Sequence, residues 1–135
     1  MSKLVVIVQC DTVCQDCVGM PCTNAFYNRE GTFKDYPEDT QYVAFTCGGC
    51  CGIGLARKLE NLTHKLKRFN IAKEDVVIHL ASCIVSDNYH NPPCPHKDYL
   101  KAIIERKGFQ YKIGTYVSKA ATAKREAGIY KEWDE

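Results

Sequence analysis

Three apolar runs in this chain each end in a cysteine. The runs cover residues 4–9, 42–46 and 76–82, and the cysteines are Cys10, Cys47 and Cys83. Continuous apolar runs of this length, rich in β-branched residues, are typical of parallel strands covered on both faces. Because the carboxyl ends of parallel strands meet at one edge of a sheet, we expect these three thiols within about 10 Å of one another.

Each of these cysteines also opens a loop that holds further sulfur or imidazole ligands. The further residues are Cys14, Cys17 and Cys22 after the first run, Cys50 and Cys51 after the second, and Cys94 with His96 after the third. If the three runs are neighbouring strands, all nine thiols gather at one edge of one sheet. A single cysteine is often a small buried hydrophobe, but nine at one edge indicate a metal or redox site.

Helical patterns alternate with the apolar runs. We expect helices at 24–29, 55–69 and 98–107, a fourth strand at 111–117, and a surface loop at 33–41. This order predicts a single-domain α/β fold: a mostly parallel sheet of about four strands, with helices on both faces and the cysteines at its C-terminal strand edge. We expect the domain to cover residues 1–117 and to be followed by a weakly helical tail at 118–135.

Charge and length exclude several classes of function. The net charge of +2 over 135 residues argues neither for nor against a nucleic-acid partner, but the basic residues are scattered, so we expect none. The first apolar run is too short for a signal peptide or a membrane span, so we expect no membrane association. The expected compartment is the cytoplasm, where thiols stay reduced.

Two glycines separate Cys47 from Cys50. Glycine adopts positive φ readily and lets the backbone pass close to a bulky inorganic group. Gly48 and Gly49 are therefore predicted to lie against a bound cofactor.

Two familiar cysteine spacings fit this chain less well. The spacing of Cys10, Cys14 and Cys17 is that of the cluster-binding loop in radical SAM enzymes, but 135 residues are too few for the barrel of those enzymes. A local iron–sulfur loop is the alternative that this spacing leaves possible. Cys47 and Cys50 have the spacing of the thioredoxin dithiol. That fold needs terminal antiparallel strands, which the sequence does not indicate.

The motifs together resemble the CGGC domain family, a family of small prokaryotic proteins to which metal binding is ascribed. The resemblance extends from about Lys3 to Thr115 and rests on Cys10, Cys17-x4-Cys22, the stretch from Phe45 to Cys50, the stretch from His79 to Cys83, and Cys94-Pro95-His96. It implies that the ligands come from Cys10, Cys17, Cys22, Cys47, Cys50, Cys83, Cys94 and His96. Cys14 and Cys51 are additions to the family pattern, and the resemblance implies no particular reaction, which leaves open whether the protein is an enzyme.

The number of thiols bears on the choice of metal. Thiolate-rich sites select zinc, copper(I) or iron–sulfur clusters, and one structural zinc uses only four ligands. One or two iron–sulfur clusters, for example of the 4Fe–4S type, use more of these cysteines, so we favour them over zinc. The alternative from another class is a dithiol oxidoreductase or redox sensor that uses Cys47 and Cys50. A redox protein or a small sulfur compound is the expected partner.

Overall fold

A computed structural model describes residues 3–49, 52–85, 94–115 and 119–129. Its strands are β1 (Leu4–Gln9), β2 (Gln41–Thr46), β3 (Val76–Leu80) and β4 (Gln110–Ile113). Its α-helices are α1 (Met20–Tyr27), α2 (Ile53–Arg68), α3 (Ser82–Val85), α4 (Lys97–Arg106) and α5 (Lys119–Glu126). Three short 3-10 turns, η1 (Val13–Gln15), η2 (Gly31–Phe33) and η3 (Lys73–Asp75), lie in the connections.

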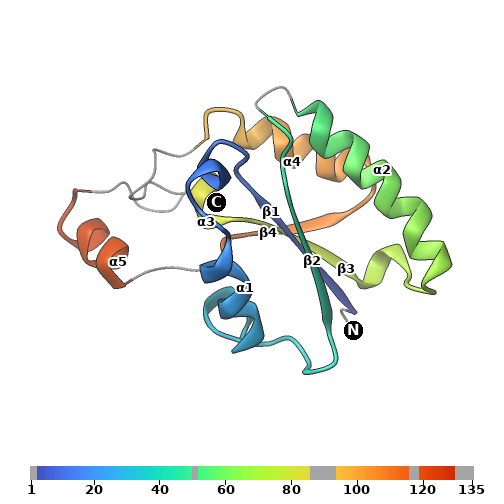
Figure 1. The fold of residues 1–135 in the computed structure, drawn as a ribbon, viewed down its shortest axis with the longest axis horizontal. Helices are drawn as coiled ribbons and strands as arrows, with labels where there is room; N and C mark the ends of the chain where they lie inside the picture. The colour runs from blue at the N-terminus through green and yellow to red at the C-terminus, as the bar shows by residue number, and fades with distance from the viewer. Residues whose placement is uncertain (1–2, 50–51, 86–93, 116–118, 130–135) are drawn as a thin grey trace.

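The four strands form one parallel sheet in the order β2-β1-β3-β4. The chain moves from β1 to β2 in one direction and then crosses back to β3 and β4. Right-handed crossovers in opposite directions place their helices on opposite faces. Figure 1 accordingly shows α2 and α4 on one side of the sheet and α1 on the other. The predicted α/β fold is confirmed.

Alternate residues of the central strand β1 fill two separate cores. Leu4, Val6 and Val8 pack with the apolar stripes of α2 and α4. Val5 and Ile7 pack on the opposite face with Phe26 and Phe33. All β1 side chains are buried, and those of Leu4–Val8 are all apolar, which is the pattern of a strand covered on both faces.

Some boundaries differ from the expectation. The first helix begins at Met20 rather than at residue 24, with Pro21 in its first turn, where proline costs no helical hydrogen bond. The expected loop at 33–41 is fastened by Arg29, whose guanidinium donates hydrogen bonds to the carbonyls of Tyr36 and Pro37. The fourth strand ends at Ile113, and residues 116–117 of its expected range lie outside the described residues.

The tail segment that we expected to be weakly helical contains α5, which lies to one side of the sheet in Figure 1. Among the described residues, none of the helices combines the length and the apolar character that a membrane span requires.

Candidate metal centre at the carboxyl edge of the sheet

The cysteines that follow β1, β2 and β3 lie at the carboxyl edge of the sheet. Gln9 is in register with Thr46, and the amide of Cys47 donates a hydrogen bond to the Gln9 carbonyl across 2.9 Å. Cys10 and Cys47 therefore leave the sheet side by side. On the other side of β1, the Ala81 amide donates to the Val8 carbonyl across 2.9 Å, and Cys83 follows in α3.

Cys83 lies directly beside the end of β1. The Cys10 amide donates a hydrogen bond to the Cys83 Sγ across 3.4 Å. Burial raises the pKa of the Cys83 thiol to about 12, the Cys10 amide lowers it, and the neighbouring thiolates of Cys22, Cys10 and Cys14 raise it further. In the absence of a metal this sulfur therefore keeps its proton at neutral pH.

The loop after β1 turns back over the same edge. The amide of Cys14 donates to the Cys10 carbonyl across 2.9 Å, and the amide of Cys17 donates to the Val13 carbonyl across 2.8 Å, so η1 holds these thiols close to the strand end. Burial raises the pKa of Cys14, and the charges of Cys17, Cys10, Cys22 and Asp11 raise it further.

These electrostatic interactions define a group of five thiols, which we call the five-cysteine group. Its members are Cys10, Cys14, Cys17, Cys22 and Cys83. They come from the end of β1, the loop after it, α1 and α3. Burial and the charges of neighbouring thiolates raise the pKa of Cys14 and Cys83, so a bound cation would favour the deprotonated form of both.

Backbone N–H groups point at three of the sulfurs at this edge. Besides the Cys10 amide on Cys83, the Gly19 amide donates to the Cys17 Sγ across 3.4 Å, and the His96 amide donates to the Cys94 Sγ across 3.4 Å. Hydrogen bonds of this kind stabilise the thiolate form, which is the form that ligates metals.

A hydroxyl pair supports the sulfur of Cys22. The amides and hydroxyls of Ser82 and Thr115 exchange two hydrogen bonds of 3.2 and 3.1 Å, and the Thr115 Oγ1 lies 3.1 Å from the Cys22 Sγ. Because the Thr115 oxygen already accepts the Ser82 amide, its hydroxyl hydrogen is available to the sulfur. Neither residue was predicted as part of the site, because both fall inside the expected strand regions 76–82 and 111–117, whereas β3 ends at Leu80 and β4 at Ile113.

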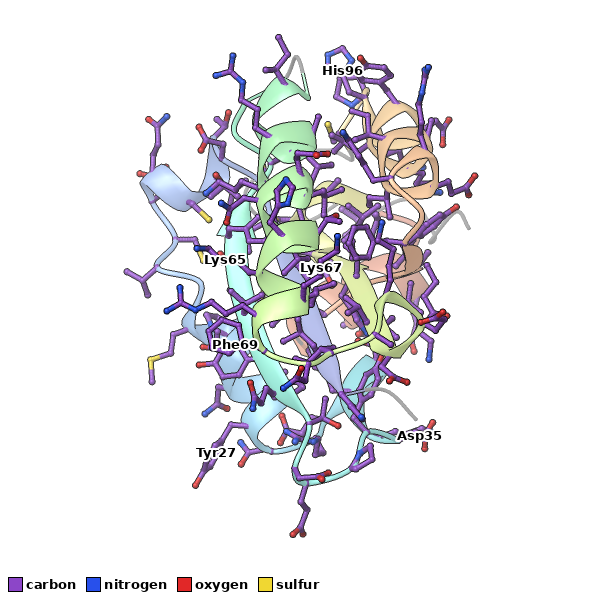
Figure 2. All side chains as sticks on the ribbon, turned by 90° about the vertical axis from the view of Figure 1, so that its right-hand side faces the viewer. Tyr27, Asp35, Lys65, Lys67, Phe69 and His96 are labelled. Carbon is purple, nitrogen blue, oxygen red and sulfur yellow. The ribbon has the colours of Figure 1, made fainter. Side chains whose placement is uncertain are left out.

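Cys94 and His96 approach the same edge from the start of α4. The Cys94 amide donates to the carbonyl of Ile84, the residue after Cys83, across 2.7 Å. His96 is the N-cap of α4, and Figure 2 shows it at the opposite end of the molecule from Tyr27 and Asp35.

Cys47 is more buried than the five-cysteine group: it is 7% exposed and belongs to the hydrophobic core on the α2 side, against which Cys10 and Cys83 also pack. Gly48 packs against Gly54: a Cβ at Gly48 (φ +73°) would lie 2.5 Å from the Gly54 Cα. Gly49 has a φ of +112° and no atom within 4 Å of a built Cβ, so open space lies beside it. Cys50 and Cys51 lie outside the described residues.

His79 is a core residue and not part of this edge. It is fully buried, its Nδ1 lies 2.9 Å from the Gly114 carbonyl, and its Nε2 lies 2.7 Å from the Tyr36 hydroxyl. The Gly114 carbonyl can only accept, so Nδ1 carries the proton and Nε2 accepts from Tyr36. Burial lowers the pKa of His79 to about 4.

The seven described cysteines are all free thiols. Within residues 3–49, 52–85, 94–115 and 119–129, no three histidine, cysteine, aspartate or glutamate side chains are grouped closely enough to hold a metal ion.

A family model described as the CGGC domain matches residues 4–116, which include every candidate ligand from Cys10 to His96. No curated protein and no solved structure matches the chain significantly.

Proposed function

The chain belongs to the CGGC domain family, and from this premise we propose that it is a metal-binding protein that carries one or two iron–sulfur clusters at the carboxyl edge of its sheet. Family membership supports metal binding as the class of function. The type of metal is our inference from the donor set.

The five-cysteine group is the observation that carries this proposal. Besides burial, the thiolates of Cys10 and Cys22 raise the pKa of both Cys14 and Cys83, so sulfurs from the end of β1, from α1 and from α3 share one neighbourhood. Cys94 is tied to Ile84, the residue after Cys83. A tetrahedral zinc uses four ligands, so this edge offers more thiols than one zinc can bind. A cluster with four cysteine ligands, or two such clusters, uses the set more fully.

The surroundings of the sulfurs also fit an iron–sulfur cluster. Amides of Cys10, Gly19 and His96 and the hydroxyl of Thr115 are placed to donate to sulfur. Such donors hold thiolates in place and shift the reduction potential of a cluster. When bound, the cluster would supply one-electron transfer, which favours a redox, electron-transfer or sulfur-handling role.

Zinc is the nearest alternative, since the same thiols ligate it. Dithiol exchange at Cys47 and Cys50 is the alternative from another class. The burial of Cys47, only 7% exposed, weighs against it, because thiols that exchange disulfides are partly exposed.

The proposal also includes a redox partner or small sulfur compound and a cytoplasmic location. Val18 and Met20, which are 90% and 65% exposed, flank the five-cysteine group and give a redox protein an apolar surface to contact. The open space beside Gly49 suits a small sulfur compound. A site built from free thiols works in a reducing compartment, so we assign the protein to the cytoplasm.

Anaerobic reconstitution with iron and sulfide tests the proposal. The unmodified protein is compared with a Cys10→Ser/Cys83→Ser double variant and with a Cys47→Ser variant. We expect the double variant to lose most of its iron and acid-labile sulfide. If the double variant bound as much iron and sulfide as the unmodified protein, the five-cysteine group would not be the site.

A further inference from the structure

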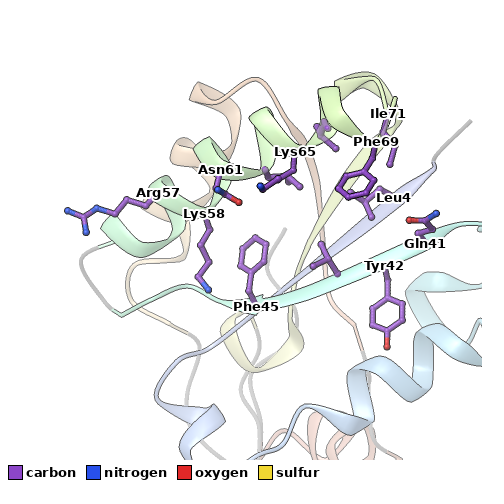
Figure 3. A pocket seen from close by; sticks show the side chains of 13 residues that line it. Leu4, Gln41, Tyr42, Phe45, Arg57, Lys58, Asn61, Lys65, Phe69 and Ile71 are labelled. Carbon is purple, nitrogen blue, oxygen red and sulfur yellow. The ribbon is translucent and has the colours of Figure 1, made fainter.

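A groove of about 520 Å³ lies between β2 and α2, away from the cysteines. Its floor is apolar, with Val43 and Phe45 from β2 and Phe69 from the end of α2. Phe69 is 65% exposed, although it is a large apolar side chain. Figure 3 shows Phe45, Lys58, Lys65 and Phe69 around one hollow.

The groove runs along an open edge of the sheet. β2 is the outermost strand on its side and pairs only with β1 among the described strands. The amide of Gln41 donates to the carbonyl of Lys3, the residue before β1, and the amide of Cys47 donates to that of Gln9. Because successive residues of a strand turn their N–H and C=O groups to opposite sides, those of Tyr42 and Ala44 point outward along the open edge.

The side chains of β2 alternate between the two faces of the sheet. Gln41, Val43 and Phe45 are in register with Leu4, Val6 and Val8, so they share the α2 face and line the groove. Tyr42 points to the other face, where its ring lies 5.1 Å from that of Phe26. A strand added beside β2 would therefore insert every second side chain into the groove.

The charges around the groove are all of one sign. Arg57, Lys58 and Lys65, three exposed residues of α2, line it, and none of the described lining residues is acidic. The Lys58 ammonium lies 5.3 Å from the centre of the Phe45 ring, so the apolar floor and a cation adjoin directly. This combination favours an occupant whose groove-facing side chains, which are every second residue of the added strand, include both apolar and acidic ones.

We infer that the β2–α2 groove binds an extended acidic segment of a partner protein, which adds to the sheet as a strand beside β2. Main-chain hydrogen bonds to Tyr42 and Ala44 supply affinity, and the cations of α2 select acidic side chains. A second copy of this chain fits less well, because two-fold pairing through β2 brings the same cations together.

A peptide pair tests the charge selection. A fluorescent peptide that repeats Val-Thr-Glu-Thr presents valine and glutamate in turn on one face. It is titrated with the full-length protein, and a peptide with lysine in place of every glutamate is the matched control. We expect saturable binding of the glutamate peptide and at least about tenfold weaker binding of the lysine peptide, the effect of about 1.4 kcal/mol in binding free energy. Equal binding of the two peptides would overturn the charge selection.

Two sets of variants locate the binding. The double variant Lys58→Glu/Lys65→Glu changes two exposed positions. It should bind the glutamate peptide about tenfold more weakly than the unmodified protein does, and the lysine peptide more tightly. Ala44→Pro removes an N–H that points away from β1, so the fold should persist while strand addition is lost. His64→Ala, on the same helix but outside the groove lining, is the control that should leave binding unchanged.

The oligomeric state of the protein separates this inference from pairing of two copies. Sedimentation of the unmodified protein should show a monomer at concentrations where the peptide binds. A dimer that Ala44→Pro converts to a monomer would show that a second copy occupies β2 and would overturn the inference. The iron content should be the same in all groove variants, so this test stands apart from that of the metal site.

Discussion

The backbone amide of Cys10 donates a hydrogen bond to the sulfur of Cys83 across 3.4 Å and 73 positions of sequence. This bond joins the end of the central strand to the start of α3, and it exists because β1 and β3 are parallel neighbours in register. The burial that raises the pKa of Cys83 to about 12 makes this thiol costly to ionise without a metal. A bound metal ion would remove that cost, so metal binding and the order of this edge should be coupled.

Removal of the metal should therefore lower stability. Anaerobic chelation is expected to lower the melting temperature by several degrees and to speed amide hydrogen exchange most in residues 11–20, the loop that carries Cys14 and Cys17. Differential scanning calorimetry and exchange mass spectrometry check this. Identical melting temperatures and exchange patterns with and without metal would contradict the coupling.

Single cysteine variants should rank the ligands. Cys83→Ser is expected to lower the metal content more than Cys14→Ser, because Cys83 follows a strand and receives the Cys10 amide, whereas Cys14 is an addition to the family pattern. Elemental analysis after identical reconstitution measures this, and Cys51→Ala should behave like Cys14→Ser. A site emptied by Cys14→Ser alone would instead indicate a separate cluster loop formed by Cys10, Cys14 and Cys17.

The apolar runs and the cysteines that end them were sufficient to predict this architecture. Burial on both faces makes β1 apolar from Leu4 to Val8, and strand ends of a parallel sheet share an edge, so the neighbourhood of Cys10, Cys47 and Cys83 followed from the strand order. His79 lies in the middle of β3, and both of its ring nitrogens have hydrogen-bond partners in the core.

Contacts between loops could not be predicted in this way. The contact of Thr115 with Cys22 depends on β4 lying beside β3 and on the register of Leu80 with Ile113, which hydrophobic periodicity does not encode. The close approach of Gly48 and Gly54 is likewise a contact between a strand end and the next helix. Nothing in the spacing of the glycines distinguishes that packing role from space for a cofactor.

The Thr115 hydroxyl should influence the site through Cys22. Thr115→Val removes the acceptor of the Ser82 amide and the donor to sulfur, so we expect a loss of about 1–2 kcal/mol in unfolding free energy and a shift in the reduction potential of the reconstituted protein. Thr115→Ser keeps the hydroxyl and is the control. A potential that is the same in all three proteins would show that this hydroxyl does not act on the cluster.

Gly48 should tolerate a side chain much less than Gly128. The two glycines have φ values of +73° and +76°, so alanine meets a similar backbone penalty of about 1 kcal/mol at both. A Cβ at Gly48 would also lie 2.5 Å from the Gly54 Cα, whereas one at Gly128 has no atom within 4 Å. Gly48→Ala should therefore lower the free energy of unfolding, measured with urea, by about 1–3 kcal/mol more than Gly128→Ala does. Equal losses in the two variants would refute the close contact.

His79 should make the fold sensitive to acid. Its pKa is lowered from 6.5 to about 4 in the folded chain, so between these values the unfolded chain binds a proton that the folded chain does not. Stability should fall as the pH drops from 6.5 to 4, by about 3 kcal/mol in total at 1.36 kcal/mol per unit, with no further loss from this group below pH 4.

Urea unfolding of the unmodified protein and of His79→Gln across this pH range checks the prediction. The difference in free energy between the two proteins should shrink as the pH falls, while His64→Gln, at an exposed helix position, should follow the unmodified protein. A difference that does not change with pH would mean that His79 is not the group responsible.

We propose that thiols at the carboxyl edge of the sheet bind an iron–sulfur cluster. Anaerobic purification followed by iron, sulfide and zinc analysis, with visible and EPR spectra before and after dithionite, tests this binding most directly. We predict a brown protein with iron and sulfide in equal amounts and a visible absorption that dithionite bleaches. A colourless protein with stoichiometric zinc, or one that binds no metal and forms a reversible Cys47–Cys50 disulfide, would contradict this claim.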